Sequence, residues 1–467
     1  MIFSPRQCLA SCCHAVAVAG LLLATFSSAR AAAASDAATD EVDLLITNGL
    51  VFSMDAARAT IADGFVAIDD ARIVAVGPAA EGARYRAAKT VDARGGIVMP
   101  GMINTHTHAA MTVFRGLGDD VADRLRRFIW PLEAKVVDAE LVYWGALHGM
   151  IEMVEGGVTS LVDSYPFPES TTRAAQELGI RAFIAYPMKD DFAPFRTYVE
   201  SLRGDPLITP VVGLHSPYAE TPERIRAAAK LADELGLLST MHVAEMDFEL
   251  KELREKHQQT PIEYLDSLGL LGPRFIAAHA IFLTESDIAL LAQRDVAVAH
   301  NMVANIKSAK GVAPVLKLRA AGVRVGLGTD GPMSGNTLDL IGQLGYVAKL
   351  HKLDNQDRTV MPAMDVVEMA TLGGARTLRR ETQLGSLEPG KLADVIIVDT
   401  ESTAMVPLYD VATNLVYSAS PRDVRTTIIQ GRVVMEDRRL LTVDPALVTG
   451  KVREIMRRVR AVVPDVK

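Results

Sequence analysis

The stretch PGMINTHTH, residues 100–108, decides the fold of this chain. It follows the apolar run GIVM at residues 96–99, so its histidine pair stands where a buried strand would end. Side chains two residues apart on a strand share a face. His106 and His108 can therefore point into one cavity and hold a single ion. A lone His-x-His pattern is common, so its meaning depends on the rest of the chain.

Other polar residues follow at wide spacing, each at the end of a short apolar stretch. Between residues 99 and 382 such stretches alternate with helical segments, which is typical of a repeated βα fold. Eight candidate strands end near His108, Asp163, Tyr186, His215, His242, His279, His300 and Asp330. We therefore expect an α/β protein with a (β/α)8 TIM-type barrel over residues 99–382. Its active site should lie at the carboxyl ends of the strands.

Sequence on both sides of the barrel predicts a smaller domain. Residues 42–98 contain short alternating stretches separated by Gly and Asp turns, and β character returns over residues 383–445. We expect these two segments to form one composite β-sandwich domain into which the barrel is inserted. Residues 446–467 predict a C-terminal helix whose Lys and Arg residues form a solvated face.

The first 31 residues are typical of a signal peptide. Arg6 supplies a positive charge, and residues 15–26 form an apolar run that is too short to span a bilayer comfortably. The sequence Ala-Arg-Ala at residues 29–31 fits a small-x-small cleavage site. Residues 32–41 then predict a flexible lead-in. A membrane anchor is the alternative interpretation of the same run.

Composition and charge limit the cellular locations and the classes of partner that we expect for the protein. The net charge of −8 gives no basic footprint for nucleic acid. All three cysteines, Cys8, Cys12 and Cys13, precede the predicted cleavage site, so the mature chain would have no thiol. That suits an oxidising compartment. No second long apolar run follows, so we expect an exported, periplasmic or secreted protein with no stable membrane association after cleavage.

The residues at the strand ends have the chemistry of a metal site. His106, His108 and His242 supply three imidazoles, and Asp330 supplies a carboxylate. Such a set suits Zn²⁺, and imidazole also suits Fe²⁺. An ion with an open position lowers the pKa of bound water and makes hydroxide available. Glu245 and His279 can reach that water and its target as general acid and base.

Across residues 44–445 the chain resembles the amidohydrolase superfamily. It is most similar to the branch of adenosine, S-adenosylhomocysteine and 5′-methylthioadenosine deaminases and triazine hydrolases. The resemblance rests on the motifs PGMINTHTHAAMTVFRG (100–116), WPLEAK (130–135), LHSPY (214–218), MHVAE (241–245), AHA (278–280), AHN (299–301), GVAPVLKL (311–318), GLGTDG (326–331) and GSLEPGKLADVIIVD (385–399). The family implies a composite β-sandwich around a (β/α)8 barrel and one divalent metal per chain, usually zinc.

The resemblance also implies roles for individual residues. His106, His108, His242 and Asp330 would bind the metal, and Asp330 would take a proton from the attacking water. Glu245 would protonate the ring nitrogen beside the attacked carbon, and His279 would orient the hydroxide. The implied reaction is deamination of an aminopurine nucleoside or a related N-heterocycle, with release of ammonia.

The substrate contacts follow from the same resemblance. Glu133 of WPLE would contact ribose hydroxyls, His215 of HSPY would contact the purine, and Ser334 would approach the ring. The partner is thus a small heterocyclic molecule, and homo-oligomerisation is left open. Two segments depart from the family pattern. HNMVANIKS at residues 300–308 stands where HNPxSNLKL is usual, and GTDGPMS at residues 328–334 replaces GTDGAAS.

Other interpretations stay open. The same site could hydrolyse a pterin, an oxidised guanine or a triazine, including loss of chloride. A peptidase-type amidohydrolase with two metals would need a carboxylated Lys at the end of strand four, where Lys189 would qualify only if the strands were miscounted. Lys189 or Arg196 could hold a substrate carboxylate. A non-enzymatic binding protein on a decayed enzyme fold is the remaining possibility. Finally, we expect His300 to support the site from behind, and His257 and His351 to be exposed.

Overall fold

The apolar stretches between His108 and Asp330 form eight parallel strands. A computed structural model describes residues 40–463, and it pairs these strands in chain order. Their side chains are buried almost throughout, as expected of parallel strands covered by helices. The strands are β6 (Met102–Thr107), β7 (Val158–Ser164), β8 (Arg181–Pro187), β9 (Ile208–Gly213), β10 (Ser239–Val243), β11 (Phe275–His279), β12 (Ala297–His300) and β13 (Arg324–Leu327).

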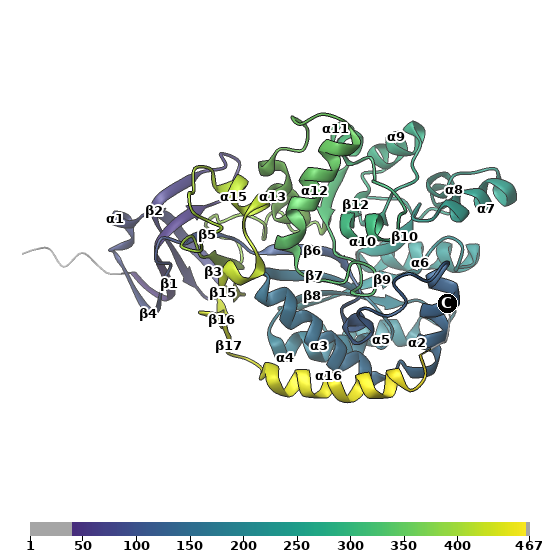
Figure 1. The fold of residues 1–467 in the computed structure, drawn as a ribbon, viewed down its shortest axis with the longest axis horizontal. Helices are drawn as coiled ribbons and strands as arrows, with labels where there is room; N and C mark the ends of the chain where they lie inside the picture. The colour runs from purple at the N-terminus through teal and green to yellow at the C-terminus, as the bar shows by residue number, and fades with distance from the viewer. Residues whose placement is uncertain (1–39, 464–467) are drawn as a thin grey trace, which may run out of the picture. The chain divides into compact units, whose positions relative to one another are not determined.

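Hydrogen bonds link the last barrel strand, β13, to the first, β6. The backbone amides of Thr329 and Asp330 donate to the carbonyl of His106 at 3.2 and 3.1 Å. The hydroxyl of Thr105 donates to the carbonyl of Leu327 at 2.9 Å. The strands therefore surround one axis, with helices outside them (Figure 1). The predicted (β/α)8 barrel is confirmed, and so are the eight strands that the sequence indicates.

Helices connect the barrel strands, and several of them begin at a side-chain cap. In α6, the Thr221 side chain accepts from the amide of Arg224 at the start, and Gly236 ends the helix at a φ of 67°. The barrel helices are α3 (Ala139–Glu155), α4 (Pro168–Leu178), α5 (Ala193–Ser201), α6 (Pro222–Leu235), α7 (Asp247–His257), α8 (Pro261–Ser267), α9 (Glu285–Gln293), α10 (Met302–Lys307), α11 (Val315–Ala320), α12 (Leu340–Asp354), α13 (Ala363–Ala370) and α14 (Leu372–Thr377). Between β6 and α3 the chain forms η1 (Ala109–Phe114), η2 (Leu125–Ile129) and α2 (Trp130–Val136).

The two ends of the chain share one mixed sheet of nine strands. N-terminal β5 pairs with β1 on one side and with C-terminal β14 on the other, so the C-terminal strands complete the N-terminal sheet (Figure 1). The strands are β1 (Asp40–Phe52), β2 (Thr60–Asp69), β3 (Arg72–Pro78), β4 (Tyr85–Asp92), β5 (Ile97–Pro100), β14 (Val395–Val398), β15 (Val424–Ile429), β16 (Arg432–Glu436) and β17 (Arg439–Leu440). The short helices beside them are α1 (Ala79–Gly82) and η3 (Pro421–Asp423).

Some segment bounds differ from the sequence analysis. Strand β1 begins at Asp40, so the last two residues of the predicted lead-in are strand. Strand β5 extends the small sheet to Pro100, two residues past the boundary expected at residue 98. Helix α15 (Val411–Tyr417), within the segment assigned to the sandwich, packs on α12 and α13. The predicted signal peptide, residues 1–31, and the lead-in up to residue 39 lie outside the described residues.

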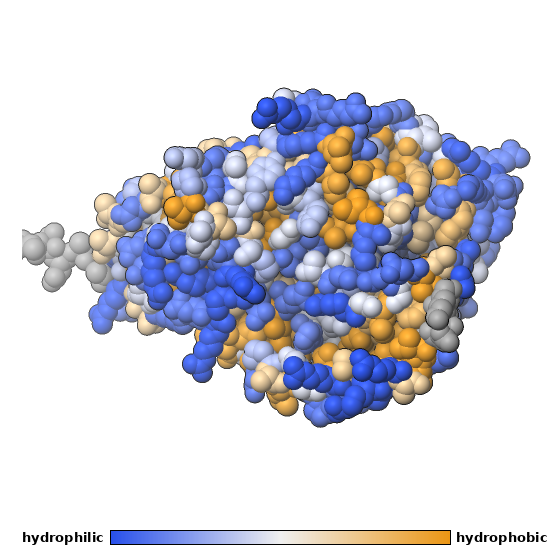
Figure 2. Space-filling model, in the orientation of Figure 1, coloured by the Kyte–Doolittle hydropathy of each residue, from blue (hydrophilic) through white to orange (hydrophobic). Residues whose placement is uncertain are grey.

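The C-terminal helix α16 (Pro445–Arg460) packs along α3 (Figure 1). It buries Val448, Ile455 and Val459 against the barrel. Its outer face is mostly hydrophilic, as Figure 2 shows. Within residues 40–463, no helix combines the length and the apolar character needed to cross a membrane.

A buried ion pair links the barrel to the small sheet. Arg181, at the start of β8, donates from Nε and Nη2 to the two carboxylate oxygens of Asp394, both at 3.0 Å. The side chains are 6% and 4% exposed. Arg181 also donates to Gln430 and to the carbonyl of Pro206. Every part of the fork is therefore satisfied in a site that excludes water.

Candidate active site

The predicted metal ligands meet at the carboxyl end of the barrel. Nε2 of His108 lies 3.1 Å from Nε2 of His242 and 3.2 Å from Oδ1 of Asp330. Nε2 of His106 lies 3.9 Å from the same Asp330 oxygen. Two donors on a tetrahedral zinc, each at ~2.05 Å, would be about 3.3 Å apart. The structure therefore brings all four residues together at distances compatible with one ion.

Backbone carbonyls orient two of these rings. Nδ1 of His108 donates to the carbonyl of Ser164 at 2.5 Å, and Nδ1 of His242 donates to the carbonyl of His215 at 2.7 Å. A carbonyl only accepts, so each ring carries its hydrogen on Nδ1 and presents a lone pair at Nε2. Two lone pairs 3.1 Å apart repel each other unless a cation or a proton lies between them.

The burial of His106 gives an independent argument for a metal. Its side chain is 1% exposed, and neither ring nitrogen has a hydrogen-bond partner among residues 40–463. An unpaired buried imidazole is costly, and a cation would satisfy it. Burial would lower the pKa of His108, but the Asp330 carboxylate raises it to about 9. Without a cation, a proton would thus occupy this position. The residues present fit a divalent metal.

Left-handed backbone conformations shape the rim of the site. The φ angles of Ala244, His279 and Asp330 are 51°, 74° and 58°. Non-glycine residues adopt this region at a cost, and such residues concentrate at functional sites. At these positions the chain turns sharply after β10, β11 and β13. The turns direct the side chains of Glu245, His279 and Asp330 towards one point.

Glu245 and His279 lie beside the ligands and beside each other. Nε2 of His279 is 3.6 Å from Oε1 of Glu245 and 3.9 Å from Oδ2 of Asp330. Nδ1 of His279 is held by Oδ1 of Asn305 at 2.8 Å. Burial would raise the pKa of Glu245, but the charges of His279 and Lys310 lower it to about 2. The carboxylate is therefore ionised before substrate binds.

The turn that carries Glu245 is fixed by a second acidic side chain. Oε1 and Oε2 of Glu249, in the first turn of α7, accept from the amides of Ala244 and Glu245 at 2.7 and 3.1 Å. Glu249 is fully buried. The two amides lie in the turn before α7, which begins at Asp247, so Glu249 links the helix to that turn.

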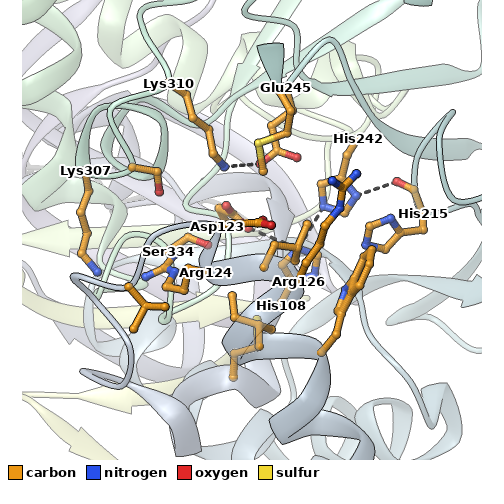
Figure 3. A pocket seen from close by; sticks show the side chains of 18 of the residues that line it. His108, Asp123, Arg124, Arg126, His215, His242, Glu245, Lys307, Lys310 and Ser334 are labelled. Atoms are coloured by element: carbon orange, nitrogen blue, oxygen red, sulfur yellow. Dashed lines mark hydrogen bonds and ion pairs between the residues drawn. The ribbon is translucent and has the colours of Figure 1, made fainter. Parts of the chain in front are cut away.

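A cavity of about 1040 Å³ opens from this cluster. All three predicted substrate residues, Glu133, His215 and Ser334, line it. Figure 3 shows His215 and Ser334 at its wall. Glu133 projects from α2, His215 follows β9, and Ser334 follows β13. Apolar side chains complete the wall and suit a flat heterocycle, namely Met111, Ile129, Trp130, Phe248 and Phe282. The volume lies at the upper end of the range for small-molecule sites.

The cavity also contains residues that the sequence analysis missed. The hydroxyl of Tyr165 donates to Oε1 of Glu133, and Nζ of Lys310 donates to Oε1 of Glu245. Further basic side chains at the wall are Arg124, Arg126 and Lys307. Lys310 lies two residues after the segment that departs from the family pattern. That departure was the available signal, and nothing in the sequence pairs Tyr165 with Glu133.

The structure argues against two of the alternatives that the sequence left open, the two-metal centre and a substrate carboxylate bound by Lys189 or Arg196. Lys189 and Arg196 are exposed and do not line the cavity. The strands were counted correctly, since β9 is the fourth barrel strand and leads to His215. No Lys therefore stands where a two-metal centre would need one, and neither cation holds a substrate carboxylate here.

One histidine was placed wrongly. His351 is 1% exposed rather than exposed, and its Nε2 lies 3.2 Å from Nε2 of His300, which is equally buried. Its polar sequence neighbours suggested exposure. On α12, however, His351 follows Leu344, Val347 and Ala348 at helical spacing and shares their buried face. His257 is exposed, as expected.

Known proteins are similar to this chain in sequence and in fold. Residues 97–434 match the model of the amidohydrolase family. A 5-methylthioadenosine/S-adenosylhomocysteine deaminase of Syntrophobacter fumaroxidans is 40% identical, over 92% of this chain and 99% of that protein. A 5′-deoxyadenosine deaminase of Methanosarcina acetivorans is 38% identical, over 88% and 97%. The crystal structure of an adenosine deaminase from Xanthomonas campestris with bound zinc has a TM-score of 0.89 and 34% identity, over 91% and 100%. With these matches and this site, the chain belongs to the amidohydrolase family.

Proposed function

We propose that this protein is a metal-dependent deaminase that releases ammonia from an adenine nucleoside. It is a hydrolase acting on carbon–nitrogen bonds, as its family and its deaminase relatives indicate. The observation that carries the proposal is the meeting of three imidazoles and Asp330 with Glu245 and His279 at one end of the cavity. These groups provide ion binding and proton transfer at the same point.

The residues have distinct tasks in this reaction. His106, His108, His242 and Asp330 would hold the ion, which when bound supplies hydroxide at neutral pH by acidifying water. Asp330 accepts the proton of the attacking water, and His279 orients that water through Nε2. Glu245, an ionised carboxylate in the free protein, takes up the other proton of that water and passes it to the ring nitrogen beside the attacked carbon. The proton on Asp330 passes to the amino group, which leaves as ammonia.

The cavity wall supports recognition of a nucleoside. Glu133 is half-buried at the cavity wall, and carboxylates accept from paired ribose hydroxyls. The ring of His215 lies 5.8 Å from that of Trp130, close to where a purine would lie. The relatives named above are deaminases of 5′-deoxyadenosine, 5-methylthioadenosine and S-adenosylhomocysteine. We therefore propose an adenosine-type substrate that varies at its 5′ position.

We further propose one zinc ion per chain. The donor set of three imidazoles and one carboxylate suits zinc, and iron is the alternative. Elemental analysis of the purified protein tests both number and identity. Two metals per chain would contradict the proposal and favour the two-metal hydrolase.

Ammonia release tests the reaction. The zinc-loaded protein is assayed with adenosine, 5′-deoxyadenosine, 5′-methylthioadenosine, S-adenosylhomocysteine, guanine, 8-oxoguanine, cytosine and pterins, beside the variant His279→Asn. We expect release from at least one adenine nucleoside, lost in the variant. Release from a free base or pterin alone would keep the chemistry and overturn the nucleoside assignment. If no compound releases ammonia, the result would favour another leaving group, such as the chloride of a triazine, or a non-catalytic protein.

We also propose that the protein is exported. The support is the positively charged start, the apolar run at residues 15–26, and the absence of cysteine from residues 14–467 of the sequence. Fractionation of the native cells tests this. Recovery in the periplasm or medium with a new N-terminus near Ala32 is expected, and full-length protein in the cytoplasm would contradict it.

A further inference from the structure

A lysine contacts the carboxylate that, in the proposed reaction, delivers a proton to the ring nitrogen. Nζ of Lys310 donates to Oε1 of Glu245, as the dashed line in Figure 3 shows. The two side chains are 14% and 9% exposed. Both line the substrate cavity. The contact therefore lies beside the reacting atoms and is largely shielded from water.

The segment that carries Lys310 is itself held in place. The amide of Lys310 donates to the carbonyl of Asn305 at 2.9 Å, and Ala309 turns the chain at a φ of 53°. Asn305 is fully buried, and its side-chain oxygen accepts from Nδ1 of His279. One short segment thus contacts both proton-handling residues, His279 through Asn305 and Glu245 through Lys310.

The contact leaves one oxygen of Glu245 for substrate. Oε1 accepts from Lys310 and faces His279. Among residues 40–463, the hydrogen bonds and ion pairs of the Glu245 side chain all involve Oε1, and Oε2 has none. A carboxylate fixed through one oxygen cannot rotate freely, so its second oxygen keeps a constant direction. Proton transfer depends steeply on such positioning.

We propose that Lys310 is a positioning residue that fixes Glu245 through Oε1, so that Oε2 is presented to the ring nitrogen of the substrate. This inference rests on the proposed function of deamination. Lys310 acts through Glu245 and contacts no reacting atom. Its contribution should therefore appear in turnover more than in substrate affinity.

Kinetics of three variants test the proposal. Lys310→Met removes the ammonium, Lys310→Arg keeps a cation, and Lys310→Ala leaves room for n-propylamine to replace the lost atoms. Lys317→Met is the matched control, because Lys317 pairs with Glu285 on the exposed surface of α11. Each zinc-loaded protein is assayed for ammonia release from the best nucleoside, and its metal content is measured.

We expect Lys310→Met to lower kcat roughly 10- to 100-fold, with KM within about threefold and metal content unchanged. Lys310→Arg should retain more kcat than Lys310→Met, and n-propylamine should restore part of the turnover of Lys310→Ala. Lys317→Met should behave like the wild type. Unchanged kcat in Lys310→Met, or a rise in KM alone, would overturn the positioning role. So would a lack of response of Lys310→Ala to the amine.

Unfolding measurements separate this inference from the proposed function. If the wild type releases no ammonia from any nucleoside, the function fails, and the contact is still tested by the Tm of Lys310→Met, Glu245→Gln and the double variant. Contacting partners give non-additive effects. We expect the double variant to lose less Tm than the sum of the single variants. Additive losses would show that Lys310 does not hold Glu245.

Discussion

Tyr165 determines how Glu133 presents its carboxylate to the cavity. The Tyr165 hydroxyl donates to Glu133, and burial raises the pKa of that carboxyl although the hydrogen bond favours its charged form. We predict that Tyr165→Phe raises KM for adenosine about tenfold with little change in kcat, because a hydrogen bond to a charged group is lost. For 2′,3′-dideoxyadenosine, which lacks the hydroxyls that Glu133 would bind, KM should not change.

The control for this prediction is Tyr143→Phe. Tyr143 donates to Glu177 away from the cavity, so the variant removes a similar pair without touching the site. Both substrates should then keep their wild-type KM. If Tyr165→Phe harms the two nucleosides equally, Tyr165 supports the fold and not the ribose contact.

At the residue scale, the sequence allowed the prediction of site residues that stand at the ends of strands. His106, His108, His242 and Asp330 were predicted as metal ligands because each stands in or just after the last residues of an apolar strand, and parallel strands end at one face. Tyr165 and Lys310 were not found, since their partners are distant in sequence and the contacts depend on loop conformation. Only the folded chain places Lys310 against Glu245.

Among the elements, the turn between β10 and α7 depends on Glu249. Burial raises its pKa to about 8, although hydrogen bonds from the amides of Ala244 and Glu245 favour the charged form. The unfolded chain loses this proton near pH 4.5, whereas the folded chain keeps it to about pH 8. Folding therefore binds a proton across that interval, and this group makes stability fall as pH rises.

We predict that Glu249→Gln weakens this pH dependence. Glutamine does not ionise, so the Tm of the variant should fall less than that of the wild type between pH 5 and pH 8, measured by calorimetry at saturating zinc. The exposed Glu223, in the first turn of α6, provides the control variant Glu223→Gln, whose curve should parallel the wild type. Parallel curves for Glu249→Gln would show that the residue does not keep its proton in the fold.

The sequence predicted which segments are strands or helices where the apolar periodicity is strong. It did not predict the boundaries of the two domains. All eight barrel strands were expected near their observed ends. The assignment of residues 383–445 to the small domain overlooked α15, whose apolar face packs on barrel helices and not on the sheet. Periodicity indicates that a helix has a buried face but does not say which neighbour covers it.

For the molecule as a whole, the pair Arg181–Asp394 couples the barrel to the small sheet. We predict that Arg181→Met lowers the free energy of unfolding by about 3–5 kcal/mol, because Asp394 would remain as an uncompensated buried charge. Urea unfolding followed by circular dichroism measures this loss. The same substitution at Arg294 is the control, since its two-point pair with Asp266 is half-exposed and such pairs contribute about 0–1 kcal/mol.

Equal effects of the two substitutions would contradict this view. They would mean that the buried pair adds no more to stability than a surface pair. The sequence could not have revealed the coupling, because neither Arg181 nor Asp394 stands in a pattern that identifies its partner.

The pairing of β5 with both β1 and β14 also sets an order of events during synthesis. The first five strands leave the ribosome before any barrel strand, yet Val98 on β5 must wait for Ile397 on β14. Until then β5 presents a bare hydrogen-bonding edge. The barrel, built from neighbouring segments, can form meanwhile, since local contacts close fastest. The small sheet can therefore be completed only after the barrel strands have been made, and a nascent chain that stalls after the barrel would expose this edge to other chains.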